Sequence, residues 1–137
     1  MKSKGKILIV DDEPINLEFF DVMLSNLGFR IEKAADGEEA LQKVVATDPD
    51  LIILDVMMTT DTEGFSLAYK LRNNPDYRQI PIIMVTGFTK KMAEEGPEKF
   101  QHVMGESWPV THLLEKPIDP EELLSVIEDV LRETAKE

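Results

Sequence analysis

The sequence predicts an α/β fold in which a parallel sheet is covered by helices on both faces. Three short runs are continuously apolar and rich in branched side chains, at Lys6–Val10 and at residues 51–54 and 80–85. Strands that are buried on both faces have this composition. Helical patterns lie between the runs, and such an alternation is typical of a parallel sheet.

Two weaker strand candidates complete the sheet, at residues 29–34 and at His112–Glu115. The first helix is predicted by apolar residues that recur at spacings of three and four and so line one face. These residues are Leu17, Phe20, Leu24 and Leu27. Pro14 suits the first turn of this helix, where its missing N–H costs nothing.

The remaining helices are predicted from their start signals. Asp36 with Glu39 three residues later is a capping box that opens a second helix. Residues 65–72 form a third helix, and Asp119 followed by Pro120 and two glutamates opens the last one. The segment 89–110 holds several glycines and prolines, which favours loops and at most a short helix.

Composition limits the possible functions. The chain has 137 residues, which suits a single domain over 1–137, and it has no cysteine for a disulfide, a thiolate metal site or a nucleophile. No apolar run approaches the roughly 20 residues that cross a bilayer, and the run after the basic start is too short for a signal peptide. The formal net charge of −12 disfavours nucleic acid as a partner. We therefore expect a cytoplasmic protein that binds neither membrane nor nucleic acid.

Chemically capable residues follow the predicted strands. Asp11 and Asp12 follow the first, Asp55 the third, Thr86 the fourth and Lys116 the fifth. The carboxyl ends of parallel strands form the functional edge of such sheets. Clustered carboxylates repel one another, and a hard cation such as Mg²⁺ relieves that repulsion. A carboxylate beside the metal can attack phosphorus, while a hydroxyl and an ammonium hold the other phosphoryl oxygens. Each residue alone would suit a turn, cap or surface role, but together they predict phosphoryl transfer.

The motifs around these residues resemble the receiver domain of two-component response regulators, of the stand-alone, chemotaxis-regulator-like kind. They read Ile-Leu-Ile-Val-Asp-Asp-Glu-Pro, Leu-Ile-Ile-Leu-Asp-Val-Met-Met, Pro-Ile-Ile-Met-Val-Thr-Gly and Leu-Glu-Lys-Pro. The resemblance covers about residues 4–134 and implies a flavodoxin-like, doubly wound sheet of five parallel strands in the order 2-1-3-4-5.

The resemblance also implies the role of each site residue. Asp55 would be the phosphoacceptor, and Thr86 and Lys116 would hold the phosphoryl group. Mg²⁺, or Mn²⁺ in its place, would be bound by Asp11, Asp12, Asp55 and the backbone carbonyl of Met57. Pro117 would follow the lysine, typically through a cis bond.

The function implied is that of a phosphoacceptor switch, not of an enzyme that turns over a substrate. A sensor histidine kinase or a phosphotransfer protein would supply the phosphoryl group, and a downstream protein would read it. The domain would catalyse only its own phosphorylation and a slow dephosphorylation. No output domain is expected after the last helix, and the protein would be a monomer or a weak homodimer.

Several positions depart from the family pattern. The segment 59–63 lacks the usual proline and is lengthened, and so is the segment 89–110. Leu113 stands where the family has an aromatic switch residue. Met57 and Phe88 are apolar, and we expect them to shield an acyl phosphate from water.

Three other functions remain open at this point. A pseudo-receiver would keep the fold and act as an adaptor without phosphorylation. A phosphatase of the haloacid-dehalogenase type also uses an aspartate nucleophile, but Met57 stands where its second aspartate belongs. A flavodoxin-like binding module would place its phosphate loop after the first strand, where this chain has Asp-Asp-Glu.

Overall fold

The computed structural model describes residues 5–56, 63–86, 112–115 and 118–135. The elements in these ranges are strands and helices in the following order: β1 (Lys6–Val10), α1 (Pro14–Asn26), β2 (Arg30–Ala34), α2 (Gly37–Thr47), β3 (Leu51–Val56), α3 (Glu63–Arg72), β4 (Ile82–Thr86), β5 (His112–Glu115) and α6 (Pro120–Ala135). Of the helices in the described ranges, none has the length and apolar character needed to cross a membrane.

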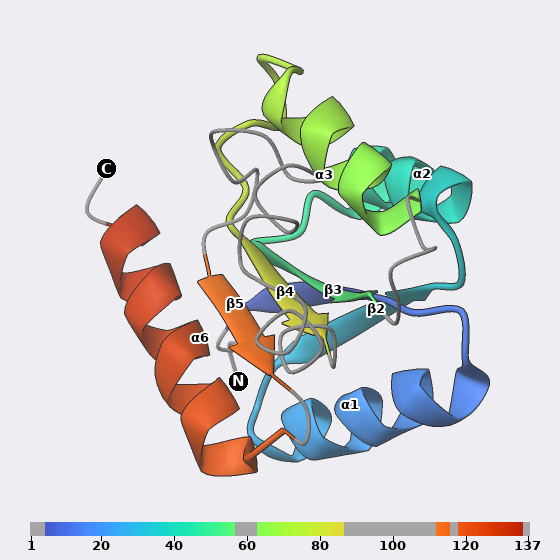
Figure 1. The fold of residues 1–137 in the computed structure, drawn as a ribbon. Coiled ribbons are helices and arrows are strands. Elements are labelled where there is room, and N and C mark those ends of the chain that lie inside the picture. The colour runs from blue at the N-terminus through green and yellow to red at the C-terminus, as the bar shows by residue number, and fades with distance from the viewer. Residues whose placement is uncertain (1–4, 57–62, 87–111, 116–117, 136–137) are drawn as a thin grey trace, which may run out of the picture.

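The strands form one five-stranded sheet in the order β2-β1-β3-β4-β5, and every neighbouring pair is parallel. Figure 1 shows α1 and α6 on one side of this sheet and α2 and α3 on the other. The predicted fold class and the predicted strand order are therefore confirmed.

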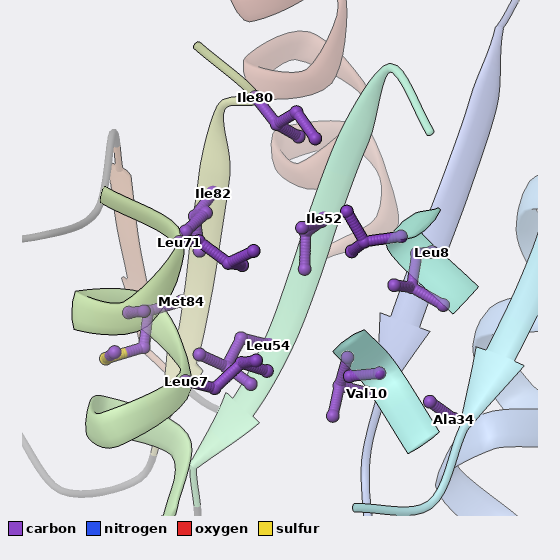
Figure 2. Close-up of a cluster of buried hydrophobic side chains, with 13 residues drawn as sticks. Leu8, Val10, Ala34, Ile52, Leu54, Leu67, Leu71, Ile80, Ile82 and Met84 are labelled. Carbon is purple, nitrogen blue, oxygen red and sulfur yellow. The ribbon is translucent and has the colours of Figure 1, made fainter. Parts of the chain in front are cut away.

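The apolar runs build two cores because successive side chains of a strand point to opposite faces. On one face, Leu8, Ile52 and Leu54 pack against α2 and against Leu67 and Leu71 of α3 (Figure 2). On the other face, alternate residues of the same strands pack against α1 and α6, and these are Ile7, Ile9, Leu51, Ile53, Ile83 and Val85. The strands are thus apolar throughout because both of their faces are buried.

The helix starts follow the predicted signals. The Asp36 carboxylate caps α2 by accepting a hydrogen bond from the Glu39 backbone N–H at 2.8 Å. The Asp119 carboxylate accepts one from the Glu121 N–H at 3.0 Å, just before α6. Pro14 occupies the first turn of α1. Each device satisfies or removes a backbone donor that would otherwise have no helical acceptor.

The boundaries of β2, β3 and β4 differ from those predicted, since β2 begins one residue later, at Arg30, and β4 ends one residue later, at Thr86. β3 continues to Val56, because Asp55 and Val56 pair with Val85 and Thr86 of β4. β4 begins only at Ile82, because the Ile80 backbone N–H is bonded to the Tyr77 carbonyl in the preceding turn. Asp55 is therefore a residue within a strand and not the turn residue that follows one.

The start of β4 is also held from α3. The Arg72 guanidinium donates hydrogen bonds to the carbonyls of Arg78 and of Ile80, the latter at 3.0 Å. Desolvation by burial lowers the pKa of Arg72 from its ordinary value. This bridge fixes the lead into β4, whose far end carries Thr86.

Candidate functional site

The sheet register brings the predicted site positions to one edge. Val10 of β1 pairs with Leu54 of β3, so Asp11 and Asp55 each come one residue later on neighbouring strands. Thr86 ends β4 and pairs with Val56 on one side and with Glu115 of β5 on the other. Asp11, Asp55 and Thr86 thus lie at the carboxyl ends of β1, β3 and β4.

Asp11 uses its two carboxylate oxygens differently. Only 2 % of this residue is exposed. Its Oδ1 accepts a hydrogen bond from the Glu13 backbone N–H at 2.9 Å, as aspartate does in many turns. Its Oδ2 is buried and has no hydrogen-bond partner among the described residues. A buried anionic oxygen in this state is costly unless a cation or a donor comes to it.

Asp55 is the second buried carboxylate of the site, with 6 % of the residue exposed. Within the described ranges, Asp11 and Asp55 are the buried charged residues. Alternation along β3 places the Asp55 side chain on the same face as Ile53, which packs against the α1 and α6 layer. Two carboxylates held this way on adjacent strands repel each other and favour a bound cation.

Asp12 differs from its neighbours because it is exposed. In the part of the chain that the structure describes, no three histidine, aspartate or glutamate side chains are placed to hold a metal ion together. The two buried carboxylates therefore fit a cation such as Mg²⁺, which proteins commonly bind through one or two carboxylates.

For the other predicted residues, the structure describes either the backbone alone or nothing. The backbone of Thr86 is described as the end of β4, and Leu113 pairs with Met84 within β5. Met57, Phe88, Lys116 and Pro117 lie outside the described residues. The lengthened segments fall almost wholly outside them as well, although Glu63 begins α3.

The sequence patterns did not predict two hydrogen bonds of the site. One is the bond from the Glu13 N–H to Asp11, and the other joins the Asp11 backbone N–H to the Ala34 carbonyl at 3.1 Å. The first has a signal, since aspartate often accepts a bond from the residue two positions later. The second depends on the pairing of β1 with β2 and has no local signal.

Comparison with known proteins gives a consistent picture. A family model described as "Response regulator receiver domain" matches residues 7–128. Among curated proteins, the alkaline phosphatase synthesis transcriptional regulatory protein PhoP of Bacillus subtilis is 33 % identical over 127 residues, which cover 93 % of this chain and 48 % of that protein. The DNA-binding dual master transcriptional regulator RpaA of Synechocystis is 30 % identical over 94 % of this chain and 50 % of its own length. This chain spans about half the length of the first curated relatives that it matches.

Solved structures resemble the chain over nearly its whole length. A CheY-like response regulator receiver domain protein from Methanospirillum hungatei superimposes with a TM-score of 0.76 at 29 % identity, covering 98 % of each chain. The chemotaxis protein CheY4 of Vibrio cholerae gives a TM-score of 0.72 at 34 % identity, covering 92 % of this chain and 98 % of that one.

Proposed function

Because this chain belongs to the response-regulator receiver family, we propose that it is a phosphorylation switch in which Asp55 accepts a phosphoryl group in the presence of Mg²⁺. The observation that carries this proposal is the pair of buried carboxylates, Asp11 and Asp55, on adjacent strands at one edge of the sheet. A structural role explains such a pair poorly, since two buried like charges oppose folding.

The metal would be held by Asp11 and Asp55, with Asp12, the Met57 carbonyl and water completing its ligands. When bound, Mg²⁺ supplies positive charge to the phosphoryl oxygens. Mn²⁺ is expected to substitute for it, because it also prefers oxygen ligands.

In the proposed transfer, a carboxylate oxygen of Asp55 attacks the phosphorus of a phosphohistidine. A new O–P bond forms as the P–N bond breaks, and the leaving imidazole nitrogen keeps the electron pair and is protonated. The Thr86 hydroxyl donates a hydrogen bond to one phosphoryl oxygen, and the Lys116 ammonium pairs with another. The product is an acyl phosphate on Asp55, which water slowly hydrolyses.

The partners follow from this chemistry. The donor would be a sensor histidine kinase or a phosphotransfer protein, and a downstream protein would distinguish the two states. Some relatives are named as transcriptional regulators, one of them DNA-binding, but the net charge of −12 argues against direct contact of this chain with nucleic acid. We propose a single receiver domain over 1–137, monomeric or weakly dimeric, that acts in the cytoplasm.

Incubation with acetyl phosphate and Mg²⁺, followed by intact-mass measurement, tests the proposal. We expect the mass of one phosphoryl group to be gained by the wild type and by Asp76→Asn, a control that changes one exposed carboxylate. We expect no gain for Asp55→Asn, or for the wild type when a chelator removes the metal. A folded wild type that gains nothing would assign the chain to the unphosphorylated adaptors. Multiple turnover of phosphate esters would assign it to the phosphatases.

A further inference from the structure

The side chains of β4 do little to fix the position of this strand along the sheet. Ile82 and Met84 are buried on the side of α3, while Ile83 and Val85 are buried on the opposite face. A strand with one apolar face resists a shift of one residue, because the shift would expose that face. β4 is apolar on both faces, so it would still bury apolar side chains after such a shift. Its position therefore depends more on the contacts at its ends.

The start of β4 is held by hydrogen bonds to two successive residues, Ile80 and Pro81. The Ile80 N–H donates to the Tyr77 carbonyl at 3.0 Å, and the Pro81 carbonyl accepts from the Ile52 N–H of β3 at 3.0 Å. Pro81 has no N–H, so it cannot donate to a neighbouring strand. The Ile80 carbonyl accepts a hydrogen bond from Nη1 of Arg72 at 3.0 Å. A side chain of α3 is thus bonded to the backbone just where the pairing of β4 with β3 begins.

Arg72 connects this start to the body of α3. The same Nη1 atom also donates to the Arg78 carbonyl, so one nitrogen bridges two carbonyls of the segment that leads into β4. Arg72 is the last residue of α3, and Leu67 and Leu71 of this helix pack in the same buried cluster as the side chains of β4 (Figure 2). The start of β4 is therefore held by the helix that packs along the strand.

The far end of β4 carries a residue of the site. Thr86 pairs with Val56 of β3, one residue beyond the pairing of Val85 with Asp55. A strand rises about 3.3 Å per residue, and successive residues lie on opposite faces. A shift of β4 by one residue would therefore move Thr86 by about 3.3 Å and place it on the other face. Hydrogen bonds to a phosphoryl group require distances of about 3 Å, so even part of this shift would weaken them.

We propose that Arg72 is a positioning residue for the phosphoryl transfer. By fixing β4 along its own axis, it would hold Thr86 beside the phosphoryl group that Asp55 accepts. Arg72 would not touch that group, because it contacts the opposite end of β4. This role rests on the phosphorylation of Asp55 proposed above, and it names a residue outside the site on which the rate of that reaction depends.

Amide NMR of the full chain tests the positioning without any phosphorylation. Arg72→Met keeps an apolar stem and removes the donors, and we expect it to change amide shifts along β4 as far as Thr86 and to weaken the cross-strand contacts with β3. Arg78→Met removes an exposed arginine from the same turn and is expected to affect its neighbours alone. Changes in Arg72→Met that stop at residues 78–82 would overturn the proposed role, because Arg72 would then cap the turn and nothing more.

The rate of phosphorylation by acetyl phosphate and Mg²⁺ measures the consequence for the reaction. We expect Arg72→Met to slow it by about tenfold, a smaller loss than the roughly hundredfold that removal of one donor to a developing charge can cost. Arg72→Lys should recover most of the rate, because one nitrogen atom makes both bonds. Arg78→Met is expected to keep the wild-type rate. Calorimetry should find the same Mg²⁺ affinity in all three variants, since Asp11 and Asp55 belong to β1 and β3 and not to β4.

A double-mutant cycle shows whether Arg72 acts through Thr86. In a Thr86→Ala background, we expect Arg72→Met to slow phosphorylation by less than about twofold, because the donor that it positions is already absent. An equal loss in both backgrounds would overturn the proposed role, since a general loss of stability would act in both. Thermal melts confirm that each variant is folded. A wild type that gains no phosphoryl group would refute the switch itself, and the NMR comparison would then decide the positioning of β4 separately.

Discussion

At the scale of single residues, the buried carboxylates that suit the site to a cation are costly to the stability of the fold. One carboxylate oxygen of Asp11 accepts a hydrogen bond from the Glu13 backbone N–H. The other oxygen is buried and has no hydrogen-bond partner among the described residues. Asp55 adds a second buried carboxylate on the next strand. Both buried carboxylates are therefore expected to be more costly without a cation than with one.

Asp11→Asn tests this cost. The variant keeps an oxygen that can accept from the Glu13 N–H and replaces the second, charged oxygen by a neutral group. Without divalent cations, we expect the free energy of unfolding to rise by about 1 kcal/mol, because a neutral polar group is cheaper to bury than a carboxylate. Urea unfolding with and without Mg²⁺ measures this. A metal that stabilised the variant as much as the wild type would contradict the role of Asp11.

Asp21 carries a pH dependence outside the site. The Lys33 ammonium at 3.0 Å and the Ser25 hydroxyl at 2.8 Å lower the pKa of Asp21 from its ordinary value. A lowered carboxyl pKa stabilises the fold above the unfolded pKa of about 3.9, and that stabilisation is lost as the pH falls through the folded value. Because both side chains are partly exposed, we expect Asp21→Asn to cost less than about 1 kcal/mol at neutral pH. Urea unfolding should show this difference vanish below the folded pKa, and a difference that persists there would exclude this origin.

Phe88 bears on the lifetime of the phosphorylated state. If its side chain shields the acyl phosphate from water, Phe88→Glu should lose the phosphoryl group faster than the wild type, since a carboxylate can orient an attacking water. The decay of the phosphorylated mass after removal of acetyl phosphate measures the rate. Equal rates in the two proteins would count against shielding.

At the scale of elements, the ends that carry local chemical signals could be predicted and the others could not. Asp36, Asp119 and Pro14 mark helix starts because caps and prolines act within one turn. The end of β3 carries no such signal. It lies at Val56 because backbone pairing with β4 continues past Asp55, and that pairing depends on a strand distant in sequence.

The end of α2 offers a stability test. Asp48 ends this helix in the left-handed region, with φ of 49°, and its charge lies beside the negative end of the helix dipole. Asp48→Gly is expected to raise the free energy of unfolding by about 0.5–1 kcal/mol, because glycine adopts this conformation without strain. Asp48→Asn should recover part of the gain by removing the charge alone. Urea unfolding of both variants measures their free energies of unfolding. A lower value for Asp48→Gly than for the wild type would contradict this explanation.

At the scale of the whole molecule, the sequence pattern predicted the layers of the fold, whereas the family resemblance implied the order of the strands. The apolar runs and their spacing predicted a parallel sheet between two helix layers, and the cores on either face confirm it. The strand order came from the resemblance, because periodicity does not say which strands are neighbours. Residue types after the strands predicted a shared edge, and the register brings Asp11, Asp55 and Thr86 to it.

Other properties depend on how much of each surface the tertiary structure covers. The sequence did not indicate that Asp12 is exposed while Asp11 is buried, although the two are adjacent. It also did not indicate that Phe19 is exposed while Phe20 is buried, because both are apolar residues of the same predicted helix; Phe19 is 50 % exposed and Phe20 is 2 % exposed.

The central claim is that Asp55, out of 27 acidic side chains, receives the phosphoryl group. Its most direct test is to treat the protein with acetyl phosphate and Mg²⁺, reduce any acyl phosphate with borohydride, and sequence the peptides. Reduction converts a phosphorylated aspartate to homoserine and so marks its position. We expect homoserine at position 55 alone, and only when Mg²⁺ is present. Homoserine at another position, or at none in a folded protein, would contradict it.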